Sequence, residues 1–100
     1  MPAVSRKSGQ DSIATNHGCD ATTVTNEGSS KVLVEGYGVV RDGDQCAVHL
    51  FPVGIGCGSH VVSLSSYSNK VYADGKGIGR VGDFYNGHSL TTGSSKVIAG

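Results

Sequence analysis

The segment GSSKVLVEGYGVVRDGD, residues 28–44, decides how the chain folds, because it recurs as YSNKVYADGKGIGRVGD, residues 67–83. A partial third copy, GSSKVIAG, occupies residues 93–100. The equivalent Lys-Val pairs are Lys31-Val32, Lys70-Val71 and Lys96-Val97. A segment duplicated in this way is one structural unit that packs against its copies, since no copy alone can bury its apolar face.

Short strands and tight turns are predicted along the chain. KVLVEG and KVYADG alternate with period two, which is typical of strands, and no window has a convincing helical period. Glycine makes up 16 of the 100 residues, which favours turns and would break long helices. The chain is therefore predicted to be all-β and to form a single domain over residues 1–100.

The repeat becomes threefold when PAVSRKSGQD, residues 2–11, is aligned with GVVRDGD, residues 38–44, and GIGRVGD, residues 77–83. The three strand–turn–strand units then run from Pro2 to about Val34, from Gly38 to Tyr72 and from Gly77 to Ile98. Such units can pack around a pseudo-threefold axis as a small cone that tapers where the strands shorten.

Charged and apolar positions in the repeat have predicted structural roles. Arg41 and Arg80 are expected to pair with Asp44 and Asp83 across a Gly-Asp turn rather than to act in catalysis. The repeat also places valines at positions 32, 34, 71 and 97, which are expected in the core, with contacts at the wide base as the alternative.

The composition excludes several classes of protein. Eight acidic and eight basic residues give a formal charge of zero, so the basic stripe of a nucleic-acid binder is missing. The chain has no apolar run long enough to span a bilayer. Its N-terminal MPAVSRKSGQDS lacks the apolar stretch of a signal peptide, so any export is expected to use another machine.

Cysteine and histidine suggest a metal site. The three cysteines, Cys19, Cys46 and Cys57, are an odd number, which argues against a closed disulfide framework. Cys19 and Cys57 are expected to be packing residues, although either could replace Cys46 as a ligand. Three histidines precede Ser-rich strand starts and would converge on a pseudo-threefold axis: His17, His60 and His88. With Cys46 as the fourth donor they predict one structural zinc ion, and metal binding would help to stabilise so small a core.

Taken together, the motifs resemble the PAAR-repeat proteins, which sharpen the central spike of contractile injection machines. The resemblance covers nearly the whole chain and rests on NHGC (16–19), GVVRDGDQC (38–46), GIGRVGDFYNGH (77–88), the Ser-rich steps into Lys-Val and the final VIAG. The Pro-Ala-Ala-Arg motif itself is degenerate here: PAVSR, GVVR and GIGR keep the small residues and the arginine.

The resemblance implies a zinc-tipped β-rich cone, with His17, Cys46, His60 and His88 as the metal ligands. A site that uses His49 in place of His60 or Cys46 would also fit, because His49 follows Arg41 by the same eight residues that separate His88 from Arg80. With His60 as the ligand, substitution of His49 is expected to matter less than that of the other three histidines.

The function that the resemblance implies is mechanical rather than enzymatic. One monomer would cap a trimeric β-helical spike, a VgrG-like protein or its phage-tail counterpart, and would touch the target membrane transiently. A separate effector protein is a further partner that the resemblance allows, and nucleic acid is not expected as a partner. The expected location is the baseplate tip of a phage virion, or the bacterial cytoplasm followed by export through type VI secretion.

Two other functions compete with the spike tip. A small zinc hydrolase would use Asp20, Asp44 or Asp83 as a general base beside a three-ligand metal, but a chain of 100 residues offers little room for a substrate pocket. A zinc-stabilised module that binds nucleic acid or protein is the other alternative, although zero net charge disfavours nucleic acid.

Overall fold

The chain folds into short β-strands without any helix, as the computed structural model of residues 1–100 shows, so the all-β prediction is confirmed. The ten strands are β1 (Ser12–Ala14), β2 (Thr22–Val24), β3 (Leu33–Val34), β4 (Tyr37–Gly38), β5 (His49–Val53), β6 (Gly56–His60), β7 (Tyr72–Ala73), β8 (Lys76–Gly77), β9 (Phe84–Tyr85) and β10 (His88–Leu90). None of the chain forms a helix long and apolar enough to cross a membrane.

All strand pairs are antiparallel. One sheet has four strands in the order β2-β1-β10-β9, and the remaining strands form the two-stranded ribbons β3–β4, β5–β6 and β7–β8. The pairing of Ile13 with Leu90 joins the first and last parts of the chain in the larger sheet. The early and late histidine loops are thereby brought to the same end of the molecule.

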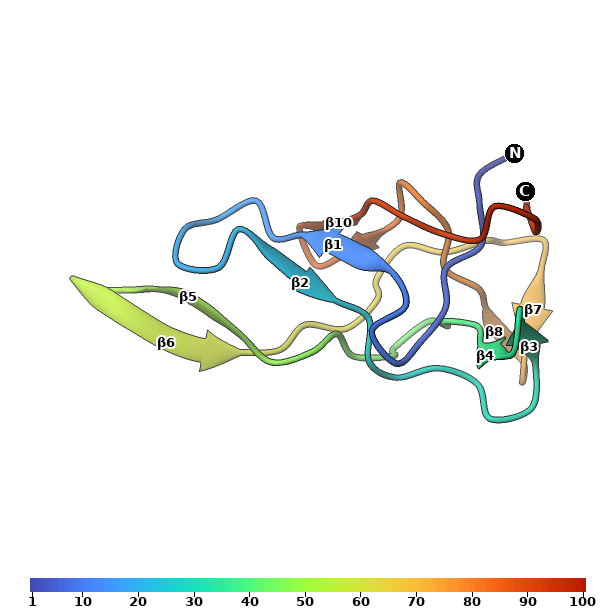
Figure 1. Cartoon of the computed structure of the whole chain (residues 1–100), viewed down its shortest axis with the longest axis horizontal. Coiled ribbons are helices and arrows are strands. Elements are labelled where there is room, and N and C mark those ends of the chain that lie inside the picture. The colour runs from blue at the N-terminus through green and yellow to red at the C-terminus, as the bar shows by residue number, and fades with distance from the viewer.

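The molecule is elongated, with principal extents of 42 × 23 × 21 Å. Figure 1 shows the β5–β6 hairpin projecting from one end, while β3–β4, β7–β8 and both chain termini lie at the other. We call the first end the apex (β5–β6 and the loop of residues 15–21) and the second the base (β3–β4, β7–β8, residues 1–4 and residues 94–100). The body therefore narrows from several ribbons at the base to one hairpin at the apex.

The base ribbons turn where the repeat has an acidic residue followed by glycine. Glu35 and Gly36 have φ of 53° and 85°, and Asp74 and Gly75 have φ of 55° and 77°. Positive φ at both central residues defines the tight hairpin turn whose twist matches the flanking strands, and glycine adopts it without steric cost. In the third copy the two ends of the chain take the place of a hairpin, since residues 3 and 98 form an antiparallel bridge.

The repeated segments meet in a closed triangle of backbone hydrogen bonds. The N–H of Ser5 donates to the carbonyl of Gly79 (3.1 Å), that of Gly79 to Val40 (2.8 Å), and that of Val40 to Ser5 (3.1 Å). These three residues directly precede Arg6, Arg41 and Arg80 in the aligned repeats. The alignment of PAVSR with GVVR and GIGR therefore corresponds to a physical contact among the three segments.

A buried serine opens each ribbon of the base. Ser29, Ser68 and Ser94 each accept, through Oγ, the backbone N–H groups two and three residues later, at distances of 2.8–3.1 Å. Each hydroxyl donates to another ribbon: Ser29 to Asp74 (2.6 Å), Ser68 to the carbonyl of Gly100, and Ser94 to Glu35. The serine in every copy of the repeat thus fixes a local turn and ties its ribbon to the next one.

The predicted arginine–aspartate pairs are confirmed. Arg41 contacts both carboxylate oxygens of Asp44 (2.9 and 3.0 Å), and Arg80 contacts those of Asp83 in the same way (3.0 and 3.1 Å). Each aspartate also accepts the backbone N–H of its arginine, at 2.8 Å. A third pair, between Arg6 and Asp11, is 3.1 Å long in the N-terminal copy. The hydrogen bond to its aspartate is the largest influence that raises the pKa of Arg41 and of Arg80.

Two small apolar clusters form the core. The cluster toward the base contains Val4, Val34, Val39, Ala73, Ile78 and Ala99, and the one toward the apex contains Ile13, Val40, Cys46, Leu64, Tyr85 and Leu90. Of the four valines expected in the core, only Val34 is buried. The expectation was wrong for Val32, Val71 and Val97, because they lie in the serine-anchored turns and face outward at the base.

Candidate metal centre

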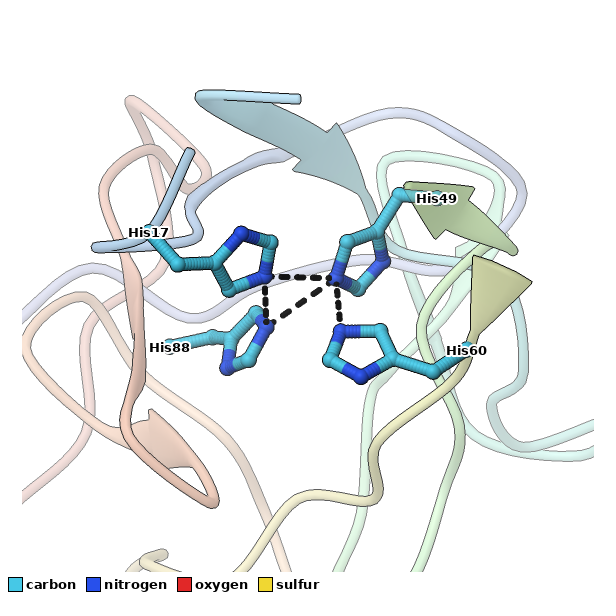
Figure 2. A group of neighbouring side chains, drawn as sticks. All are labelled: His17, His49, His60 and His88. Carbon is cyan, nitrogen blue, oxygen red and sulfur yellow. Dashed lines mark hydrogen bonds between the residues drawn. The ribbon is translucent and has the colours of Figure 1, made fainter. Parts of the chain in front are cut away.

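Four histidines from separate elements converge at the apex. His17 comes from the loop between β1 and β2, His49 begins β5, His60 ends β6, and His88 begins β10. The pairing of β5 with β6 places His49 directly opposite His60. Figure 2 shows the four imidazole rings pointing toward one another.

The donor atoms of the cluster are the four Nε2 nitrogens. His49 Nε2 lies 3.3 Å from that of His17, 3.0 Å from that of His88 and 2.6 Å from that of His60, and the nitrogens of His17 and His88 are 3.1 Å apart. The ligand atoms of all four histidines lie within 4.8 Å of one another. Four nitrogens placed tetrahedrally about 2.0–2.1 Å from one ion would be roughly 3.3 Å apart. The four side chains can therefore hold a metal ion.

Contacts on the far side of the rings orient the donors. His17 Nδ1 lies 2.7 Å from the carbonyl of Gly18, and His49 Nδ1 lies 3.1 Å from that of Ala47. An N–H that donates to a carbonyl fixes the tautomer and leaves the Nε2 lone pair free for a metal. The ring of His60 stacks on Phe51, with centroids 4.1 Å apart and planes inclined by 9°. The Nδ1 of His88 is buried without a hydrogen-bond partner.

The environment favours neutral imidazoles. Burial, with a further effect of the neighbouring histidines, lowers the pKa of His60 and of His88 below the ordinary value of 6.5. Desolvation disfavours the charged ring, and a second positive charge beside the first would add repulsion. Only the neutral ring has a lone pair to donate to a metal, so these shifts favour coordination.

The structure brings together three of the four predicted ligands. His17, His60 and His88 are in the cluster, and His49 takes the place expected for Cys46. The alternative in which His49 replaces Cys46 therefore matches the geometry. Its sequence signal was the spacing of eight residues from Arg41 to His49, which equals that from Arg80 to His88.

Cys46 lies beside the cluster rather than in it. Its side chain is buried in the apical core, with Sγ 3.8 Å from Nδ1 of His49 and 3.5 Å from the backbone nitrogen of Val62. Burial raises the pKa of this thiol. The thiol therefore contacts the rear of the His49 ring and lies outside the group of four nitrogen donors.

Cys19 and Cys57 form a disulfide across 38 residues of sequence, with Cα atoms 6.2 Å apart. The odd cysteine count argues against a closed disulfide framework, and Cys19 and Cys57 are expected to be packing residues rather than metal ligands. The disulfide shows that an odd total still leaves one pair, and the packing role was wrong because both residues are exposed at the apex; neither belongs to the histidine cluster. The bond joins the His17 loop to β6.

Comparison with known proteins returns no match among protein-family models and none among curated proteins. What the chain does is therefore inferred from its own sequence and geometry. If all four nitrogens bound one tetrahedral ion, that ion would have no open position for a catalytic water. Asp20, one of the candidate general bases, accepts the backbone N–H of Leu50 at 2.7 Å. The histidine cluster is suited to holding together three segments of the chain: the His17 loop, the β5–β6 hairpin and the start of β10.

Proposed function

We propose that this chain is the structural, membrane-piercing tip of a trimeric β-helical spike, similar to a PAAR-repeat protein of a contractile injection machine. The observation that carries the proposal is a threefold set of exposed apolar side chains at the base. Val32, Val71 and Val97 are 40%, 39% and 37% exposed, and the next residues, Leu33, Tyr72 and Ile98, are 56%, 54% and 56% exposed.

Equal exposure at equivalent positions favours a partner with three equivalent subunits. An apolar side chain left in water costs free energy that burial against a partner recovers, at about 25 cal/mol per Å². Three matching pairs at one end would meet the three chains of a trimer in the same way. The internal repeat then lets one polypeptide cap a threefold end face.

The finer architecture belongs to the same proposal: three units arranged about a pseudo-threefold axis that runs from base to apex. The closed triangle through Ser5, Val40 and Gly79 supports it, because each segment donates to one neighbour and accepts from the other. The serine contacts support it too, since each of the three ribbons is tied to a different one.

Zinc is the metal proposed for the apex. Imidazole nitrogen is a good zinc ligand, and a site with four protein donors is the usual form of a structural zinc centre. One ion would tie the His17 loop, both ends of the β5–β6 hairpin and the start of β10. Such a tie gives stiffness at the place where a cone has too little width for an apolar core.

Stiffness at a narrow end is what a piercing tip requires, because the contraction force is concentrated on a small area of target membrane. The proposed partner is the spike, with one monomer per trimer, and a separate effector protein is compatible with the same assembly. The proposed location is the baseplate tip of a phage virion, or the bacterial cytoplasm before export by type VI secretion. No observation specifically favours the hydrolase, because all four nitrogen donors of the cluster come from the protein.

The test is the stoichiometry of a complex between this chain and a purified trimeric β-helical spike protein, measured by light scattering after gel filtration. We expect one chain per spike trimer. The combined variant Leu33→Asp, Tyr72→Asp and Ile98→Asp should abolish the complex, because three charges would be buried against an apolar face.

The matched control places the same charge at the other end of the molecule. Val53→Asp and Ile55→Asp change exposed apolar residues of the apical hairpin and should leave the complex intact. Absence of any complex at micromolar concentration, or a ratio of three chains per trimer, would refute the proposal.

A further inference from the structure

The disulfide between Cys19 and Cys57 lies close in sequence to two histidines of the cluster. Cys19 is two residues after His17, and Cys57 is three residues before His60. The bond therefore joins the two segments that carry these ligands, and it is separate from the four nitrogen donors.

Few other contacts hold the apical hairpin to the body. β5 pairs with β6 alone, in a two-stranded ribbon. Outside the histidine cluster, two hydrogen bonds between Asp20 and Leu50 attach the His17 loop to β5: Asp20 N–H donates to the carbonyl of Leu50 (3.1 Å), and Leu50 N–H donates to the Asp20 carboxylate (2.7 Å). The disulfide is the one covalent link between this loop and the hairpin.

We propose that Cys19 and Cys57 form a reversible redox site that controls how tightly the apex holds its metal. When the disulfide is formed, His17 is held beside His49 and His60 before the ion arrives, so less freedom is lost on binding. When the bond is reduced, the loop and hairpin must be ordered by the metal itself, and affinity falls. The inference rests on the metal centre proposed above.

The chemistry is thiol–disulfide exchange with a small disulfide of the glutathione class. The thiolate of one cysteine attacks the oxidised reagent and releases one thiol, which gives a mixed disulfide. The thiolate of the second cysteine then attacks the protein sulfur and releases the second thiol. The two protein thiols lose two protons and two electrons, which the reagent gains, and reduction is the reverse. Both cysteines are exposed, so such a reagent can reach them.

Coupling of this kind must be reciprocal. If the disulfide raises metal affinity by some factor, bound metal must shift the disulfide equilibrium toward oxidation by the same factor. If the disulfide did not change the metal affinity, bound metal would not change the disulfide equilibrium.

The experiment uses the full chain and zinc alone, with affinity measured by competition against a chromophoric chelator. One sample is oxidised with oxidised glutathione, and the other is reduced with a phosphine that competes weakly for zinc. We expect the zinc Kd to rise by at least about tenfold on reduction. In a glutathione redox buffer, zinc should shift the equilibrium constant for the disulfide by the same ratio.

Two variants separate the explanations. The double variant Cys19→Ser and Cys57→Ser should bind zinc as weakly as the reduced chain and should not respond to redox state. Cys46→Ala should keep the redox response, because Cys46 is the free cysteine.

Three other outcomes would contradict the reasoning. Equal zinc affinity of the oxidised and reduced chains would overturn the redox inference and leave the metal centre standing. Tighter binding by the reduced chain than by the double serine variant would overturn it as well, since the thiols would then be ligands. No zinc binding in any state would overturn the metal centre and this inference together.

Discussion

Replacement of His49 by alanine is the sharpest test of the apical metal centre, because the ligand expected from the sequence at this corner was Cys46. The Nε2 of His49 lies within 3.3 Å of all three other Nε2 atoms, so it is central to the cluster. Cys46 instead touches the rear of the His49 ring, 3.8 Å from Nδ1.

The expected magnitude follows from linkage between binding and folding. With free zinc buffered at 100 times the wild-type Kd, bound zinc would stabilise the wild type by about 2.7 kcal/mol. Groups that only support a ligand change metal affinity by roughly 10- to 100-fold, so loss of a direct donor should cost at least about 100-fold. The zinc-dependent stabilisation of His49→Ala should then be about 0.4 kcal/mol or less, and that of Cys46→Ala about 1.4 kcal/mol if its affinity falls tenfold.

Thermal unfolding with and without zinc measures these differences. For a domain of this size 1 kcal/mol corresponds to roughly 4–8 °C, so zinc should raise the wild-type Tm by about 11–22 °C. His49→Ala should lose nearly all of that rise. Because each variant is compared with and without zinc, the loss of stability caused by its truncated side chain cancels. Full retention of the rise by His49→Ala, together with its loss in Cys46→Ala, would refute the four-histidine site and restore Cys46 as a ligand.

Two further predictions concern the base and the pH response. Ser94→Ala should lower the free energy of unfolding, measured in urea, by about 1–3 kcal/mol, because two backbone N–H groups lose their acceptor. The control Ser95→Ala changes an exposed neighbour and should have little effect. Equal effects of the two substitutions would contradict the anchoring role of Ser94. The pKa of His60 and of His88 is lowered from 6.5 in the folded chain, so just below that pH the unfolded chain binds more protons. The free energy of unfolding of the metal-free protein, measured by urea titration, should therefore fall as the pH drops below 6.5, and these two histidines should add no stability above that pH. A rise in the free energy of unfolding on acidification would show that the two rings are charged in the folded chain.

The sequence predicted the local features well, because each depends on residues that are near neighbours. The predicted Gly-Asp turns are found at Gly43 and Gly82, where φ is 83° and 94°, values that glycine adopts without steric cost. The pairs of Arg41 with Asp44 and Arg80 with Asp83 span three residues, so the repeated spacing was enough to infer them.

The candidate metal donors were harder to assign from sequence. His17, His60 and His88 were found because each precedes a Ser-rich strand start, but His49 and Cys46 lie three residues apart and spacing could not choose between them. The choice depends on where β5 begins. His49 starts that strand opposite His60, while Cys46 is buried with Tyr85 and Leu64. The exposure of Val32 was missed for a similar reason. Its backbone N–H donates to Ser29 Oγ, so Val32 lies in a turn and not in the alternating strand that the sequence pattern predicts.

By itself the sequence determined that the chain is all-β, that its segments repeat, and that Arg41 and Arg80 pair with Asp44 and Asp83 across a Gly-Asp turn, because short-range sterics and hydrogen bonding govern these features. Only the tertiary structure decided which donors meet at the apex, which cysteines bond, and which valines face water. Those outcomes depend on residues up to 71 positions apart, such as His17 and His88, whose approach is set by the pairing of β1 with β10. Strand pairing over such distances is fixed by the packing of the whole core and leaves no periodic signal in the chain.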